Sequence, residues 1–171
     1  MAKNSRHIYA IALGSNQPRS RKLTPRKLVA KAMKRLSEKP FKALAVSRII
    51  ETSPLGPSRR RYANAATLVE TKLDPSELLE KLCRMERKAG RNRRNRKWAA
   101  RPLDLDIILW NGGIWAEHDL IIPHPEFRKR DFVLKPLTEL VPGWRDPLSG
   151  FTVSQLRARL QKSLGKSRKA G

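Results

Sequence analysis

Apolar and acidic residues alternate in the middle of the chain, where the stretch 103–107 reads Leu-Asp-Leu-Asp-Ile. A period of two is typical of a β-strand with one buried face. The pattern therefore predicts a strand that continues to about residue 110. Its apolar side chains face the core, and Asp104 and Asp106 lie next to each other on the opposite face.

Other segments show strand-like or helical spacing. Strands are predicted at 7–13, 43–52 and 62–71, and helices at 25–37, 75–90 and 152–160. The Asn-Gly-Gly turn at 111–113 predicts a hairpin that returns at 114–115, and 120–122 is another extended piece. Because strands and helices alternate irregularly, we expect an α+β fold, with helices on an antiparallel or mixed sheet.

Length and composition favour one domain over residues 1–171, with a disordered basic tail at about 165–171. No apolar run has the length of a membrane span, and no signal peptide is evident, so a cytoplasmic location is expected. The only cysteine, Cys83, excludes an internal disulfide. The net charge of +23 predicts attraction of polyanions, including nonspecific binding.

The paired carboxylates of Asp104 and Asp106 repel each other unless a cation lies between them, and Mg²⁺ prefers such hard oxygen ligands. The basic run 91–97 lies just upstream and offers guanidinium groups to a polyphosphate. Together these features indicate phosphoryl or nucleotidyl chemistry. Taken separately, two acids on a strand are often a solvated face, and a basic run is often a nucleic-acid patch.

Two further sets of residues have candidate roles. Tyr62 and Asn64 share a strand face, where they could present an aromatic ring and an amide together, although a surface Tyr beside a strand-end Asn is the commoner case. His124 stands between Pro123 and Pro125, which fix its backbone, but a single exposed His is more often incidental.

Several motifs together resemble a known family. They are Ala-Leu-Gly-Ser-Asn at 12–16, Glu-Thr-Ser-Pro-Leu-Gly-Pro at 51–57, Tyr-Ala-Asn-Ala-Ala at 62–66, Arg-Pro-Leu-Asp-Leu-Asp-Ile-Ile-Leu at 101–109, and the run from Pro-His-Pro to Lys-Pro-Leu at 123–137. In this order and spacing they resemble the 6-hydroxymethyl-7,8-dihydropterin pyrophosphokinases of folate biosynthesis, over roughly residues 8–145. The resemblance implies a ferredoxin-like α/β sandwich, with a central, mostly antiparallel sheet flanked by helices.

The resemblance also implies an activity. Members transfer pyrophosphate from ATP to the hydroxymethyl group of the pterin and release AMP, assisted by two Mg²⁺ ions. By resemblance, Asp104 and Asp106 hold the metal, and Arg91 and Arg101 are catalytic. The residues expected near ATP are Glu86, Arg93, Trp98, Ile107, His124 and Arg130. Those expected around the pterin are Thr52, Ser53, Leu55, Tyr62, Asn64 and Phe132.

The chain departs from many relatives at Ala99 and Ala100, in a loop that closes over the site, and from some members at Asp119 and Pro125, on the nucleotide side. The expected partners are ATP and the pterin, with no membrane, and a monomer is expected. Two alternatives stay open at this point: a basic nucleic-acid-binding protein, which explains the charge but not the paired carboxylates, and an inactive homologue of the same fold.

Overall fold

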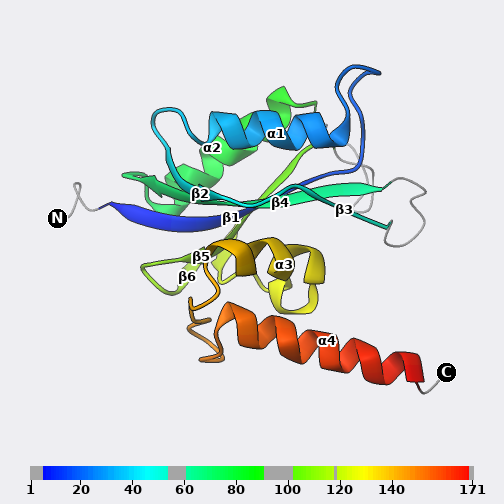
Figure 1. Cartoon of the computed structure of the whole chain (residues 1–171). Helices are drawn as coiled ribbons and strands as arrows, with labels where there is room; N and C mark the ends of the chain where they lie inside the picture. Colours follow the sequence, from blue (N-terminus) through cyan, green and yellow to red (C-terminus); the bar gives the residue numbers. More distant parts are fainter. Residues whose placement is uncertain (1–5, 54–60, 91–101, 118, 170–171) are drawn as a thin grey trace.

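A five-stranded antiparallel sheet forms the centre of the molecule, with helices on both of its faces (Figure 1). The computed structural model describes residues 6–53, 61–90, 102–117 and 119–169. The main strands follow the order β2 (Lys42–Val46), β4 (Tyr62–Thr71), β1 (His7–Ser15) and β5 (Asp104–Trp110), and β3 (Ile50–Thr52) pairs with the other end of β4. This arrangement confirms the predicted α+β fold with a mostly antiparallel sheet.

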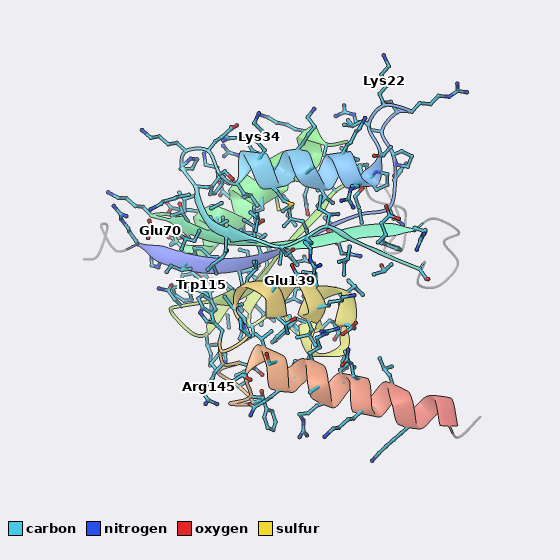
Figure 2. The ribbon with its side chains drawn as sticks, viewed as in Figure 1. Lys22, Lys34, Glu70, Trp115, Glu139 and Arg145 are labelled. Atoms are coloured by element: carbon cyan, nitrogen blue, oxygen red, sulfur yellow. The ribbon has the colours of Figure 1, made fainter. Side chains whose placement is uncertain are left out.

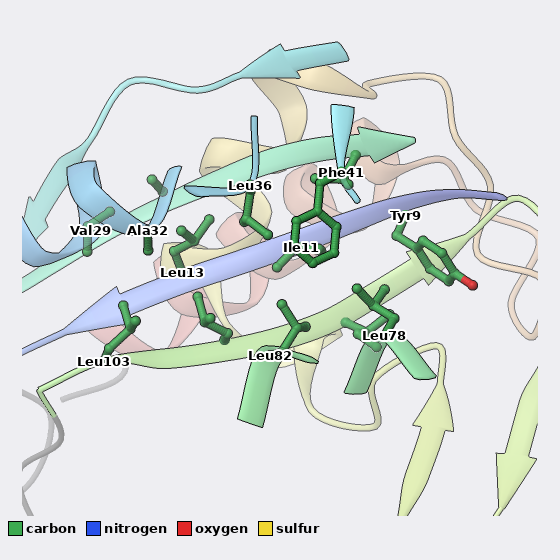
Figure 3. Packing of buried hydrophobic residues seen from close by; sticks show 14 of the residues in the cluster. Tyr9, Ile11, Leu13, Val29, Ala32, Leu36, Phe41, Leu78, Leu82 and Leu103 are labelled. Atoms are coloured by element: carbon green, nitrogen blue, oxygen red, sulfur yellow. The ribbon is translucent and has the colours of Figure 1, made fainter. Parts of the chain in front are cut away.

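Helices α1 (Pro25–Arg35) and α2 (Pro75–Lys88) cover one face of the sheet, and α3 (Asp131–Leu140) and α4 (Val153–Lys169) lie on the other side (Figure 1). Two hydrophobic clusters fill the spaces between these layers. The cluster under α1 and α2 includes Ile11, Leu13 and Leu82 (Figure 3), and the cluster under α3 includes Ala10 and Leu134. The sheet is therefore buried on both faces, which explains why β1 is almost continuously apolar.

Side-chain caps begin two of the helices, and a glycine follows the end of one. The side chain of Thr24 accepts a hydrogen bond from the backbone of Lys27 at the start of α1. Asp74 and Glu77 form a reciprocal capping box at the start of α2. Gly90 follows the end of α2 with a φ of 100°, a conformation that suits glycine.

Four predictions about where elements end and which strands pair were wrong. The strand expected at 43–52 is divided into β2 and β3, and β1 continues beyond its expected end at residue 13 to Ser15. The segment after the 111–113 turn does not return onto β5, because β6 (Trp115–Glu117) pairs with β7 (Leu120–Ile122). The basic tail predicted to be disordered from residue 165 continues α4 as far as Lys169.

The segment between β7 and α4 contributes side chains to the cluster under α3. It contains η1 (Phe127–Lys129) and α3, whose Glu139 carboxylate accepts a hydrogen bond of 3.0 Å from the backbone of Arg48 (Figure 2). In the described part of the chain, no helix is both long and apolar enough to cross a membrane.

Candidate active site

A row of three residues crosses the sheet at the ends of its central strands. Gly14 on β1 lies opposite Asn64 on β4 and, on its other side, opposite Asp104 on β5. Residues directly opposite each other in an antiparallel sheet point to the same face. The structure therefore brings Asn64 and Asp104 together on one face, with the space above Gly14 between them.

A second row lies two residues further along each strand, on the same face of the sheet. Ala12 is opposite Ala66 on β4 and Asp106 on β5. Asp106 thus shares its face with Asp104, as the alternation predicted, and small residues lie beside both carboxylates. The strands position the two aspartates, and the absence of bulky side chains on β1 leaves room next to them.

Asn64 is held in place by a neighbouring strand. Its side chain is only 4% exposed, and Nδ2 donates a hydrogen bond of 3.0 Å to Oγ1 of Thr52. A Cβ atom at Gly14 would lie 3.3 Å from Asn64 Oδ1, so the amide oxygen is directed toward Gly14. Thr52 is paired with Tyr62 across β3 and β4, which places these three predicted pterin-site residues together; Ser53 follows Thr52 and is exposed.

A β-bulge in β5 connects the carboxylates to His124. Ile11 pairs with Ile107, but Ala10 pairs with Leu109, so Ile108 is an extra residue in the strand. The Ile108 carbonyl accepts a hydrogen bond of 3.0 Å from the backbone N–H of His124. The bulge thereby anchors the segment that carries the histidine.

The imidazole of His124 faces the carboxylates. Its Nε2 atom lies 4.0 Å from Oδ2 of Asp106. Nδ1 accepts a hydrogen bond of 3.2 Å from the backbone N–H of Glu126, so in the neutral ring the proton is on Nε2. An N–H donor therefore points toward the aspartate side of the site.

The surroundings of His124 favour the neutral ring. Partial burial lowers its pKa below the ordinary value of 6.5, and the positive charge of Arg130 lowers it further, while Asp104 and Glu126 act in the opposite direction. Arg130 itself precedes α3, and its guanidinium lies 5.9 Å from the ring of Phe132. These three residues reach the site from the same side of the sheet, because Phe132 packs against the cluster under α3.

Two residues predicted to contact ATP lie on the other face of β5. Glu86 is 3% exposed, and its Oε1 accepts a hydrogen bond of 2.8 Å from the backbone N–H of Leu105. Ile107 is also 3% exposed and belongs to the cluster under α1 and α2. Since β5 is at the edge of the sheet, Glu86 occupies a backbone donor that no further strand uses.

The remaining predicted site residues, Leu55, Arg91, Arg93, Trp98 and Arg101, lie outside the described residues. Sequence reasoning overlooked three features of the site: the space at Gly14, the anchoring carbonyl of Ile108, and the bond from Leu105 to Glu86. A signal for one of them was present. The run Ile107-Ile108-Leu109 breaks the period of two where the bulge occurs.

The carboxylates of Asp104 and Asp106 fit one of two types of divalent metal site. In the described ranges, no three His, Cys, Asp or Glu residues gather into a group that could enclose an ion. Mg²⁺, however, is commonly bound through one or two carboxylates together with substrate phosphates and water. The partly exposed Asp106, beside Asp104 on one face, fits this second type of site.

The chain is similar to a family of known proteins. The family model described as 7,8-dihydro-6-hydroxymethylpterin-pyrophosphokinase (HPPK) matches residues 10–142. A 2-amino-4-hydroxy-6-hydroxymethyldihydropteridine pyrophosphokinase from Synechocystis is 44% identical over 101 residues, which cover 59% of this chain and 51% of that protein. The protein of the same name from Haemophilus influenzae is 39% identical over 132 residues and covers 76% of this chain and 79% of the relative.

The fold is also found among solved structures. The wild-type HPPK-DHPS of Plasmodium falciparum, crystallised with pteroate, has a TM-score of 0.71 at 14% identity. The alignment covers 96% of this chain and 44% of the Plasmodium chain. The chain thus spans about half the length of the Synechocystis relative and less than half of the Plasmodium protein. At 14% identity, the similarity to the Plasmodium protein is a similarity of fold alone.

Proposed function

The chain belongs to the 7,8-dihydro-6-hydroxymethylpterin-pyrophosphokinase family, and on this premise we propose that it transfers pyrophosphate from ATP to 6-hydroxymethyl-7,8-dihydropterin in folate biosynthesis. The hydroxymethyl oxygen forms a bond to the β-phosphorus of ATP. The bond from that phosphorus to the oxygen bridging to the α-phosphate breaks, AMP leaves, and the hydroxyl proton is released. The single observation that carries the proposal is the row of Asn64, Gly14 and Asp104 across the sheet.

Asp104 and Asp106 are the proposed ligands of two Mg²⁺ ions. When bound, these ions neutralise the phosphate oxygens of ATP and lower the pKa of the attacking hydroxyl. The carboxylates suit this role because they lie two residues apart on one face of a strand that is hydrogen-bonded along β1. Glu86 restrains the backbone between them through Leu105.

Asn64 is the proposed contact for the polar edge of the pterin. The bond from its Nδ2 to Thr52 fixes the amide, so the orientation is set before the ligand arrives. Tyr62 on β4 and Phe132 on α3 are the proposed aromatic partners of the flat ring, with Thr52, Ser53 and Leu55 completing the pocket. The space above Gly14 then separates the pterin edge from the metal ligands.

His124 and Arg130 are the proposed phosphate contacts on the side of α3. The neutral imidazole offers its Nε2–H as a donor, and the guanidinium adds a fixed positive charge. Arg91 and Arg101 are proposed to stabilise charge that develops on the transferred group, with Arg93 and Trp98 near the nucleotide. The reaction also requires that water, which competes with the hydroxymethyl group, be kept away from the activated phosphate.

The proposal is tested by measuring AMP formation from ATP and Mg²⁺ with and without the pterin. We expect pterin-dependent AMP together with a pyrophosphorylated pterin. The Asp104→Asn variant should lose nearly all turnover and keep its fold, and Glu80→Gln, an exposed carboxylate on α2, serves as the matched control. AMP released equally without the pterin, or none at all from folded protein, would contradict the proposal.

A further inference from the structure

A cavity of about 490 Å³ lies between α1 and α2. Both helices cover the same face of the sheet, and α3 lies on the other (Figure 1). Small-molecule sites typically occupy roughly 300–1,000 Å³, so the cavity has the size of a ligand pocket. The activity proposed above makes no use of it.

Six basic residues line this cavity, and they come from three elements. They are Arg19, Lys31, Arg35, Lys81, Arg84 and Lys88. The pairs 31/35 and 84/88 are each four residues apart, so each helix presents a basic stripe on one side. Arg19 comes from the segment after β1 and donates a hydrogen bond to the carbonyl of Lys88, which joins that segment to the end of α2.

No acidic residue lines the cavity within the described part of the chain. Glu38 and Glu80 pair with Arg35 and Arg84 at 3.3 and 3.4 Å, but neither glutamate is among the lining residues. Both ion pairs are exposed, and such pairs are largely screened by solvent. The cavity therefore has a positive potential that favours an anion.

The base of the cavity is apolar. Four of its lining residues are buried apolar residues: Leu28 and Ala32 of α1, Phe41, and Leu103. A fifth, Met85 of α2, packs against the hydrophobic cluster under α1 and α2. An inorganic anion would satisfy the basic rim but leave this surface unused, and a neutral ligand would leave the rim unused. A molecule with a phosphate at one end and an aromatic or aliphatic body at the other satisfies both.

The cavity is separate from the candidate active site. Asp104 and Asp106 point to the face that carries Ala12 and α3, whereas α1 and α2 cover the opposite face. Leu103 connects the two regions, because it lines the cavity and directly precedes Asp104. We infer that the cavity between α1 and α2 is a second ligand site, which binds a phosphate monoester with an apolar body. This inference does not depend on the proposed pyrophosphokinase activity.

The test uses 1-naphthyl phosphate as the probe, titrated into the full chain and followed by calorimetry and by amide chemical shifts. We expect saturable binding, with shifts on α1 and α2. The variant Lys31→Gln/Arg84→Gln should bind about tenfold more weakly, because two charged contacts to the phosphate are lost. The matched control Lys34→Gln/Arg87→Gln changes the same charge on the same helices, outside the lining, and should bind within about twofold of wild type. Figure 2 shows Lys34 on α1.

Three results would overturn the inference. Equal losses in both double variants would reduce the effect to general attraction by a basic surface. Equally tight binding of inorganic phosphate would show that the apolar base of the cavity contributes nothing to binding. Shifts confined to residues around Asp104 and His124 would assign the binding to the candidate active site. Circular dichroism of both variants confirms that the comparison is made between folded proteins.

Discussion

Nε2 of His124 lies 4.0 Å from Oδ2 of Asp106, although the histidine follows β7 and the aspartate lies on β5. The relationship depends on the bulge in β5, since the carbonyl of Ile108 holds the backbone of His124. Because Nδ1 accepts a bond from the Glu126 amide, Nε2–H is directed toward the carboxylates. An irregularity in the strand thus positions a donor beside the proposed metal ligands.

The protonation of His124 provides the first prediction. In an NMR titration its imidazole should have a midpoint below 6.5, because burial and Arg130 lower the pKa. Arg130→Gln should raise this midpoint, and Glu126→Gln should lower it, because Glu126 opposes the shift. As the folded pKa is lowered, the contribution of His124 to stability is present above 6.5 and is lost as the pH falls through the folded value. Shifts of the same sign in both variants would contradict this electrostatic explanation.

Glu86 provides the second prediction, as a positioning residue that acts through the backbone of Leu105. Glu86→Leu leaves that buried N–H without an acceptor, which costs roughly 1–3 kcal/mol of unfolding free energy. Glu86→Gln keeps an oxygen acceptor of similar shape and should retain most of the stability. If the bond orients Asp104 and Asp106, Glu86→Leu should also raise the Mg²⁺ concentration needed for half-maximal turnover, and Gln should restore it. A change in the KM for ATP alone, equal in both variants, would indicate direct nucleotide contact.

The features that could be predicted from the sequence are local ones. The alternation at 103–107 placed the two aspartates on one face, and the helices predicted at 25–37 and 75–90 begin at the observed first residues, Pro25 and Pro75. These signals depend on residues that are close in the sequence, so they can be recognised without knowing which distant segments contact each other. The resemblance to the pyrophosphokinases added the α/β sandwich and the family, which the structure and the comparisons confirm.

The features that were missed depend on contacts between distant segments. The turn at 111–113 looks like a hairpin, but β1 and the segment after β7 occupy the two sides of β5, so β6 pairs with β7 instead. Glu86 and Leu105 are 19 residues apart, and the 91–101 stretch between them gives no sign of their bond. The tail was expected to be disordered from about residue 165, yet α4 continues to Lys169, because one glycine at position 165 costs a helix only about 1 kcal/mol.

Asp146 provides the third prediction, for the segment that follows His124. Its buried carboxylate accepts two hydrogen bonds from Arg128, at 2.7 and 2.6 Å, two from the backbone N–H and hydroxyl of Ser149, and one from the backbone N–H of Leu148. Burial alone would raise the pKa, but these bonds lower it to about 2, from 3.8 in the unfolded chain. The stabilisation is therefore present above 3.8 and is lost as the pH falls toward about 2.

Asp146→Asn should therefore lower the unfolding free energy by about 2 kcal/mol at neutral pH, since each pKa unit corresponds to about 1.4 kcal/mol. Urea unfolding at a series of pH values measures this, and the difference from wild type should shrink in acid. Glu80→Gln removes an exposed ion pair and should change stability by less than about 0.5 kcal/mol. A difference that is independent of pH would show that packing, rather than charge, is lost at Asp146.

Gly14 provides the fourth prediction, because the lack of a side chain there leaves space between Asn64 and Asp104. The residue is in the extended part of β1 and does not have the positive φ that would require glycine. In Gly14→Ala the new methyl lies 3.3 Å from Asn64 Oδ1, in the space between that amide and Asp104. We expect the KM for the pterin to rise about tenfold or more, the scale on which one methyl group discriminates in an enzyme pocket.

The same substitution should leave the fold intact, since alanine suits a strand better than glycine by roughly 0.5–1 kcal/mol and Asn64 needs to move only slightly. Gly143→Ala is the matched control, because a Cβ there meets no atom within 4 Å. Steady-state kinetics with the pterin varied at saturating ATP, and then with ATP varied, separate the two substrates. Equal increases in both KM values would indicate that the substitution distorts the sheet generally and does not act on the pterin pocket alone. A selective increase for the pterin would mean that the bare backbone of Gly14 forms part of the pterin pocket, beside the amide that Thr52 holds.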